Sequence, residues 1–448
     1  MTINVSMLKG TATRTLCGAT LGFFVGFASV SLFNVTALKF KGPMHLNAAT
    51  LGLLMAMPLL SGSFLRIPFS AWVDRNGGRK PILILLGLAI LGVLGVFLTA
   101  HAYYPKHITP GLYPWLLFLG LLSGCGIATF SPGISQVAFW FPKKRQGWAL
   151  GAYAGFGNLA PGLFVLLMPL ALAHFALGTV YLIWLAMLIA GTGMYAILAR
   201  NAWYFQLRKA GRTEQQSATI AQEHGAELLP TGKAVRSLQL AAARWETWGL
   251  VMLYFTSFGG FLALTVWLPN YWHAAFGKPI PTAARIAGGL SLASSLVRVF
   301  GGTWADKSGG RVVGLVALSL IVLGALVAGC SLSFQNSFAG ISLIMLGMGL
   351  NNAAVFKLLP NIIPEAVSGA AGCVGGLGAL GGFVLPPIWG EIVRSQSKAE
   401  KAAAYAHGML AFAVLGAGCL ALLAVLRPKA VTTTIESPAT NASVTQTA

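Results

Sequence analysis

Two stretches, LVRVFGGTWADKSGG (residues 296–310) and LRIPFSAWVDRNGG (residues 65–78), place an arginine in an apolar run and an aspartate eight residues later. Shifted by 232 residues, positions 66–79 match positions 298–311 at six of fourteen positions. The identical pairs are Arg66 and Arg298, Trp72 and Trp304, Asp74 and Asp306, Gly77 and Gly309, Gly78 and Gly310, and Arg79 and Arg311. Such an internal repeat indicates that the chain is built from two related halves.

Composition places the chain in a membrane. Of its 448 residues, 56% are hydrophobic and only 9% are charged, and the mean hydropathy is +0.74. Too little polar surface remains to cover a water-soluble protein. A spanning helix needs about 20 apolar residues. Twelve stretches meet this length, near residues 15–37, 49–72, 81–101, 114–140, 148–172, 177–198, 246–272, 281–305, 312–332, 336–360, 366–392 and 403–426.

The net charge of +20 follows the topology of these spans. An even number of spans puts both termini on one side, and most Lys and Arg residues fall in the loops of that side. By the positive-inside rule, both termini are expected in the cytoplasm and the chain in the cytoplasmic (inner) membrane, in contact with lipid. The charge therefore does not require a nucleic-acid partner.

Residues 199–244 form the one long polar stretch inside the chain. We therefore expect a first six-helix bundle at 1–198, a cytoplasmic linker at 199–244, a second bundle at 245–427 and a disordered cytoplasmic tail at 428–448. The tail is too short for an output domain, which argues against an anion sensor.

The sequence offers no catalytic centre. No Ser/His/Asp set, metal-ligand cluster or phosphate loop lies at a plausible depth. The five cysteines are spaced too far apart for a metal cluster and are interpreted as small apolar side chains. We therefore expect no enzyme activity, no cofactor and no bound metal.

Arg66 and Arg298 each lie eight residues from the cytoplasmic end of a span, roughly 12 Å deep and near the centre of the bilayer. A charge at that depth marks a substrate site unless it is paired. Every Asp and Glu lies in a loop, in the linker or tail, or near a span end, so a small anion is the expected partner. Because a guanidinium offers a flat fork of donors, planar oxyanions such as nitrate, nitrite, formate or other carboxylates fit best.

The loop DRNGGRK (residues 74–80), with its partner DKSGGR (306–311), resembles a signature of the major facilitator superfamily. The resemblance implies an all-α membrane fold of twelve helices in two pseudo-symmetric six-helix bundles, with a site near the midplane and a monomer sufficient for activity. The aspartate can pair with basic residues or cap a helix N-terminus and so hold one conformation; a plain solvated turn is the alternative. The gating candidates are Asp74, Arg75, Arg79, Asp306 and Arg311.

Three further motifs, GAYAGFGNLAPGL (151–163), NNAAVFKLLPNIIPE (351–365) and GGLGALGGFVLPPIWG (375–390), resemble the nitrate/nitrite porter family. Their glycines bare the helix backbone to a facing helix or a small ligand, and helix packing alone is the alternative. The signature glycines are Gly155, Gly157, Gly378 and Gly381. The pair Ala160-Pro161 departs from the family pattern, where small residues, often glycine, are expected.

This second resemblance implies that Asn158, Tyr254, Phe130 and Phe258 line an anion site. Two ring faces and a phenol donor would make a slot a few ångströms high that rejects tetrahedral sulfate and phosphate. Aromatic residues of a bundle can also be plain core.

Lys357, within the tenth span, either extends its ammonium toward the cytoplasm or lies on the path by which the anion leaves.

The expected function is transport of nitrate and nitrite, with exchange of one for the other favoured. Two facing guanidiniums repel when the site is empty, so closure is expected to need an anion. Nitrate/proton symport, or exchange of another planar anion such as formate or oxalate, are the alternatives.

Overall fold

The computed structural model describes residues 8–33, 36–46, 48–230, 234–394 and 401–426, and all regular structure in these ranges is helical. Twelve helical segments in the described ranges are long and apolar enough to cross a membrane, which agrees with the twelve predicted spans. The predicted tail, 428–448, lies outside the described residues, and the predicted limits of the two bundles and the linker stay predictions.

The first half of the chain holds the first six spans. Its helices are α1 (Ala12–Phe27), η2 (Ala28–Ser31), α2 (Ala37–Lys41), α3 (Ala48–Phe64), α4 (Arg66–Asn76), α5 (Arg79–Tyr103), η3 (Pro110–Leu112), α6 (Tyr113–Gly124), η4 (Cys125–Thr129), α7 (Phe130–Ala138), α8 (Lys143–Gly157), α9 (Leu159–His174) and α10 (Leu177–Leu198). Three short helices follow, α11 (Trp203–Lys209), α12 (Glu214–Glu223) and α13 (Ala234–Ala243).

The second half holds the remaining six spans. Its helices are α14 (Trp245–Tyr254), the π-helical turn η5 (Phe255–Gly259), α15 (Gly260–Phe276), α16 (Ile280–Ser308), α17 (Gly310–Gly329), α18 (Phe334–Ile362), η6 (Pro364–Ala366), α19 (Val367–Ala379), α20 (Gly381–Arg394) and α21 (Lys401–Val425).

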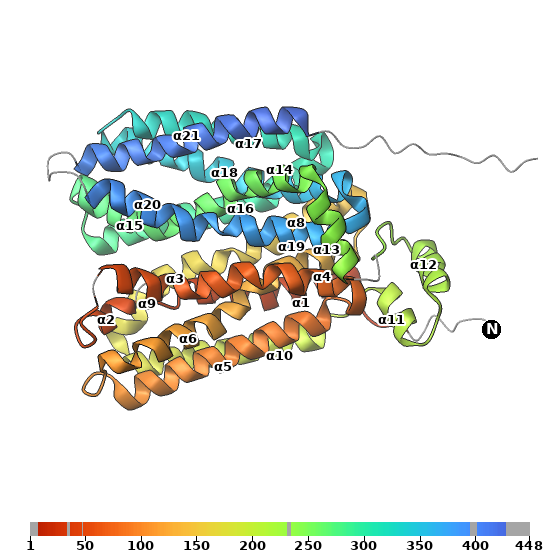
Figure 1. Cartoon of the computed structure of the whole chain (residues 1–448), viewed down its shortest axis with the longest axis horizontal. Coiled ribbons are helices and arrows are strands. Elements are labelled where there is room, and N and C mark those ends of the chain that lie inside the picture. The colour runs from red at the N-terminus through yellow and green to blue at the C-terminus, as the bar shows by residue number, and fades with distance from the viewer. Residues whose placement is uncertain (1–7, 34–35, 47, 231–233, 395–400, 427–448) are drawn as a thin grey trace, which may run out of the picture.

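The two halves form two layers that lie side by side (Figure 1). Helix α8 of the first half packs against α16 of the second, and α4 packs against α19. The described chain begins and ends at the same end of the molecule, where α11 and α12 project (Figure 1). The position of these two chain ends fits an even number of spans.

The outer surface of the helices carries large apolar side chains, unlike the surface of a soluble protein. Large apolar residues face outward, as with Phe300 (72% exposed) and Val414 (74% exposed), where lipid would cover them. Arg66 and Arg298 are instead buried within the protein. This distribution is what a bilayer solvent requires, because charged groups at membrane depth must face protein or water.

The repeated loops turn on glycine. Gly77 ends α4 with φ 73° and Gly309 ends α16 with φ 85°, a region of backbone conformation that favours glycine. Each loop therefore reverses the chain within a few residues and starts the next span, α5 or α17, at once.

Helix α13 connects the halves at the end where the chain begins. It packs against α4 of the first half and α19 of the second. The hydroxyl of Ser237 accepts a hydrogen bond from the Gly369 amide (2.9 Å), and Arg244, just after α13, pairs with Glu365 (3.1 Å). Helix α13 is thus bonded to the second half at two points.

Candidate functional site

Arg66 and Arg298 reach the interior from different local structures. The second span is interrupted at Leu65, between α3 and α4, so Arg66 is the first residue of α4. Arg298 lies inside α16, which runs unbroken for 29 residues. Both side chains are almost completely buried, at 0% and 1% exposure. Among the described residues, neither arginine forms an ion pair with a carboxylate.

Within the described part of the chain, Arg66 donates its hydrogen bonds to carbonyl oxygens. Its Nη1 donates to the Gly375 oxygen at 2.7 Å, and its Nη2 donates to the Ile127 oxygen at 3.4 Å. Gly375 belongs to α19 in the second half, so the shorter bond crosses between the halves. These neutral acceptors satisfy two donors but leave the positive charge of the guanidinium uncompensated.

Arg298 has a weaker set of contacts. Its Nη1 donates to the Tyr254 hydroxyl at 3.4 Å, the long end of the hydrogen-bond range. The Nε atoms of Arg298 and Arg66 are buried and make no hydrogen bond with any described residue. Both guanidiniums therefore keep donor capacity for a further acceptor.

The two arginines border one aromatic cluster. The Cζ atom of Arg66 lies 5.0 Å from the ring centre of Phe130 and 5.3 Å from that of Phe258. For Arg298 the same two distances are 5.2 and 5.9 Å. Ring faces within about 6 Å attract a cation, so the rings stabilise both charges without neutralising them.

The predicted aromatic residues lie together with nearly parallel rings. The centres of Phe130 and Phe258 are 5.6 Å apart at 13°, and those of Tyr254 and Phe258 are 4.8 Å apart at 10°. A flat ion between two ring faces needs a separation of about 7 Å, twice the usual contact distance. In this structure the slot between Phe130 and Phe258 is therefore closed.

Phe356 also belongs to this cluster, and the sequence analysis missed it. Its ring meets Tyr254 edge-on at 5.0 Å and Phe130 at 5.3 Å, and its centre lies 5.8 Å from Cζ of Arg298. The sequence analysis selects the next residue, Lys357, as a candidate because it is a charged residue within a span. One Phe among 26 carries no sequence signal of its own.

Asn158 lies where the fifth span is interrupted between α8 and α9. Its backbone oxygen accepts a hydrogen bond from Ser295 (3.1 Å), which precedes Arg298 by one turn of α16. Its Oδ1 atom is buried and makes no hydrogen bond with any described residue. The structure thus places Asn158 against the arginine-bearing helix, with an amide available to a further polar group.

The signature glycines mark close helix contacts. An added Cβ at Gly155 would lie 2.8 Å from the Ser295 oxygen, across the two halves. At Gly378 it would lie 2.8 Å from the Tyr254 ring, and at Gly381 2.8 Å from the Cα of Gly259. The set also includes Gly157, where an added Cβ would overlap the ring of Phe23.

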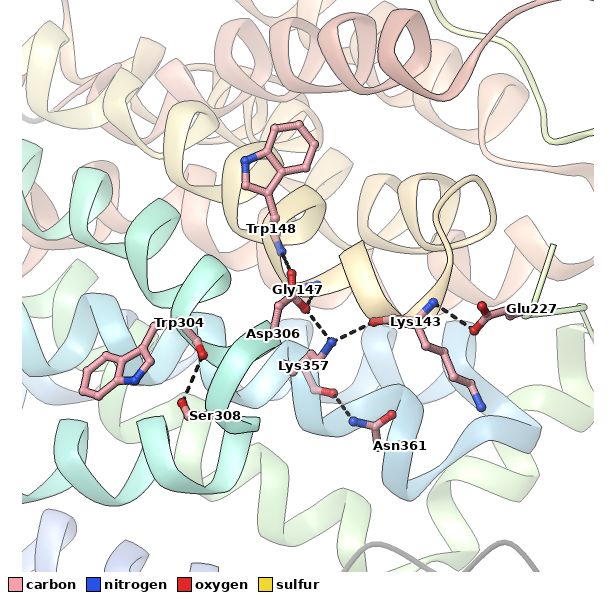
Figure 2. A network of polar contacts seen from close by, with 9 residues as sticks. All are labelled: Lys143, Gly147, Trp148, Glu227, Trp304, Asp306, Ser308, Lys357 and Asn361. Carbon is pink, nitrogen blue, oxygen red and sulfur yellow. Dashed lines mark hydrogen bonds and ion pairs between the residues drawn. The ribbon is translucent and has the colours of Figure 1, made fainter. Parts of the chain in front are cut away.

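Asp306 of the second half bonds to α8 of the first half and to Lys357 of its own half (Figure 2). Its two carboxylate oxygens accept hydrogen bonds from the amides of Gly147 (2.9 Å) and Trp148 (2.7 Å) in the first turns of α8. Lys357 pairs with the same carboxylate (2.5 Å) and donates to the Lys143 oxygen (2.7 Å). The ammonium is thus held inside the protein by a carboxylate partner that the sequence analysis did not identify.

The remaining gating candidates lie at the same end. Asp74 accepts a hydrogen bond from Ser368 at the start of α19 (2.8 Å). Arg79 donates to the Ala196 oxygen in α10 (2.7 Å), and Arg311 donates to the Ala424 oxygen in α21 (2.7 Å). The two repeated arginines therefore tie equivalent spans, the third to the sixth and the ninth to the twelfth. Arg75 is exposed at the end of α4.

Comparisons with known proteins agree with this architecture. A family model described as the Major Facilitator Superfamily matches residues 19–386. The proton:xylose symporter XylE, a protein of E. coli, superposes with a TM-score of 0.71 at 13% identity, covering 93% of this chain and 99% of that one. The predicted major facilitator fold is confirmed.

Two related proteins share more of the sequence. The chain is 30% identical over 404 residues to the probable nitrate/nitrite antiporter NarK1 of Thermus thermophilus, with 84% of each chain covered. It is 27% identical over 398 residues to the nitrite extrusion protein of Bacillus subtilis (strain 168), with 87% of each covered.

Proposed function

Because the chain belongs to the nitrate/nitrite porter family of the Major Facilitator Superfamily, we propose that it is a secondary active transporter of nitrate and nitrite. One observation carries the proposal. Two fully buried arginines, one from each half, border the same two aromatic rings, and neither pairs with a carboxylate of a described residue. A small anion supplies the missing negative charge, and the halves rock around it to expose the site to either side of the membrane.

The shape of the site supports a planar anion. Phe130 and Phe258 lie 5.6 Å apart, so an ion that enters between their faces must widen the slot. A flat ion needs about 7 Å, whereas a tetrahedral ion needs more. Sulfate and phosphate are therefore expected to be excluded, and formate and oxalate stay as alternative substrates.

We propose exchange of nitrate for nitrite as the mode of transport. The carbonyl and ring contacts of Arg66 and Arg298 leave two positive charges close together in a low-dielectric interior. Bringing the halves together without an anion therefore costs free energy, which favours return of the carrier only when it is loaded. Proton symport is the competing mode.

The proposed orientation puts the α11–α12 end in the cytoplasm of the cell, with the chain in the inner membrane. Arg75, Arg79, Lys143 and the basic residues of α11 all lie toward that end, in the arrangement of the positive-inside rule. In this orientation Asp306 and its partners close the cytoplasmic end of the transport path.

The test uses purified full-length protein in liposomes loaded with nitrite, with internal pH and anion content followed after nitrate is added outside. We expect nitrate uptake that requires internal nitrite and leaves internal pH unchanged. Liposomes without protein give the background. Uptake into empty vesicles driven by an inward proton gradient would replace exchange by symport.

Competition by external formate, oxalate and sulfate in the same assay tests the substrate class. We expect sulfate to have no effect, and external nitrite, added as a fourth competitor, to compete most strongly. An absence of nitrate and nitrite movement under both driving forces would refute the proposed function.

A further inference from the structure

Resting on the proposed function, we propose that Ser131 is a further anion-binding residue, whose hydroxyl favours nitrate over nitrite. Ser131 is the second residue of α7 and directly follows Phe130. No sequence motif singles it out.

The hydroxyl of Ser131 is buried without a partner. The side chain is 0% exposed, and Oγ makes no hydrogen bond with any described residue. A helical serine usually bonds to the carbonyl four residues earlier, which here is Ile127. That oxygen instead accepts from Nη2 of Arg66. Because an unsatisfied buried hydroxyl is costly, its retention needs an explanation.

The position of the hydroxyl supplies that explanation. A Cβ added at Gly375 would overlap Oγ of Ser131, so the hydroxyl lies against the α19 backbone. The oxygen of Gly375 is the one that accepts the 2.7 Å bond from Arg66. The Ser131 hydroxyl, the Phe130 ring and the Arg66 guanidinium therefore meet at one place, on the first-half side of the anion site.

The number of unpaired hydrogen-bond donors at the site supports a preference for nitrate over nitrite. Three donors at the site are fully buried and make no hydrogen bond with a described residue, namely Nε of Arg66, Nε of Arg298 and the hydroxyl of Ser131. Nitrate presents three oxygens in one plane, whereas nitrite presents two. An ion with a third oxygen can take the hydroxyl bond in addition to the two guanidinium bonds, and nitrite leaves the hydroxyl unsatisfied.

The experiment compares Ser131→Ala with Ser135→Ala by measuring the Kd of nitrate and of nitrite for the full-length protein in lipid nanodiscs. Ser135 is the matched control, since it is equally buried one turn later in α7, and its hydroxyl contacts Ser70 (3.4 Å) and the Ser131 oxygen (3.5 Å). For Ser131→Ala we expect the nitrate Kd to rise about tenfold or more and the nitrite Kd to change less than about threefold. Ser135→Ala should change neither the nitrate Kd nor the nitrite Kd.

Ser131→Cys is the second variant, because a thiol keeps the volume and weakens the donor. Its nitrate Kd should fall between those of the wild type and Ser131→Ala. Equal loss of both anions, equal loss in Ser135→Ala, or unchanged nitrate binding would overturn the role of Ser131. Failure of the wild type to bind either anion would instead overturn the proposed function.

Discussion

The stretches around Arg66 and Arg298 share six residues at equivalent positions but hold different places in the structure. Arg66 begins a helix at a break in its span and donates to Gly375 of the other half. Arg298 lies within an unbroken helix and donates to Tyr254 of its own half. The repeat therefore sets charge and depth, whereas the packing around each arginine sets its partner.

The same contrast holds for the aspartates. Asp306 accepts two amide hydrogen bonds at the start of α8 and pairs with Lys357. Asp74 accepts a hydroxyl hydrogen bond from Ser368 at the start of α19. Each aspartate therefore reaches a helix of the opposite half, Asp306 through two backbone amides of α8 and Asp74 through the Ser368 hydroxyl.

Replacing either arginine by lysine should have the largest effect. Arg66→Lys and Arg298→Lys should each weaken nitrate binding by about 100-fold or more, because a lysine cannot present two parallel donors to a planar ion. Calorimetric titration of the purified protein measures the loss. Arg285→Lys, on the exposed first turns of α16, should bind normally. Full binding by either lysine variant would contradict the clamp.

Asp306→Asn should have the next largest effect. It weakens the bonds across the halves to the Gly147 and Trp148 amides and leaves the Lys357 ammonium largely buried without a counter-charge, which together cost about 3 kcal/mol in the closed state. We expect a shift toward the open cytoplasmic end, measured as faster labelling of a cysteine introduced along the cytoplasmic path. The double variant Asp306→Asn/Lys357→Met should recover part of the closed population, and Lys307→Gln, at the exposed neighbouring position, should match the wild type. An unaltered labelling rate in Asp306→Asn would show that the Asp306 carboxylate does not hold the halves together.

Hydropathy and charge predicted the fold and the buried arginines, but not the interruptions of the spans. Twelve apolar stretches suffice to give twelve helices, since the bilayer leaves few other structures. The breaks at Leu65, Asn158 and Leu380 lie inside apolar runs, where the average hydropathy is unchanged. These breaks set the start of α4 and the position of Asn158, so they determine the site.

Partners distant in the sequence also escaped sequence reasoning. The contact of Asp306 with Lys357 joins residues 51 positions apart, and its contact with Gly147 joins residues 159 positions apart. These residues lie on different helices, so the periodicity within one helix cannot predict that they meet. Ser131 and Phe356 were missed for a related reason, because a serine or a phenylalanine in a span is ordinary until its neighbours are known.

Alanine substitutions of the signature glycines should have smaller effects. These effects should differ between a glycine that contacts the other half and a glycine that contacts its own half. Gly155→Ala would press on Val299 and Ser295 across the halves and should slow transport more than it lowers thermal stability. Gly381→Ala would press on Gly259 and the Phe255 oxygen within the second half and should lower unfolding stability by about 1–3 kcal/mol. Transport rates and thermal unfolding of both variants test this.

The control for the glycine pair is Gly193→Ala in α10, where no atom lies within 4 Å of the added methyl group. It should be neutral or slightly stabilising. Equal effects of Gly155→Ala and Gly381→Ala on transport and stability would remove the distinction between the two contacts.

Tyr254→Phe should have the smallest effect. It removes the 3.4 Å bond to Arg298 but keeps the ring stacked on Phe258, so anion affinity should fall about three- to tenfold. Competition binding with nitrate measures this. A loss as large as that of Arg298→Lys would mean that the phenol binds the anion directly and strongly.

Helix α13 is attached to the second half more firmly than its place in the chain, between the two halves, would require. The bonds from the Gly369 amide to Ser237 and from Arg244 to Glu365 fasten it to the second half, and it also packs against α4 of the first half. When the two halves separate at this end, α13 is expected to travel with the second half as one rigid piece. The packing contact between α13 and α4 would then separate as this end opens.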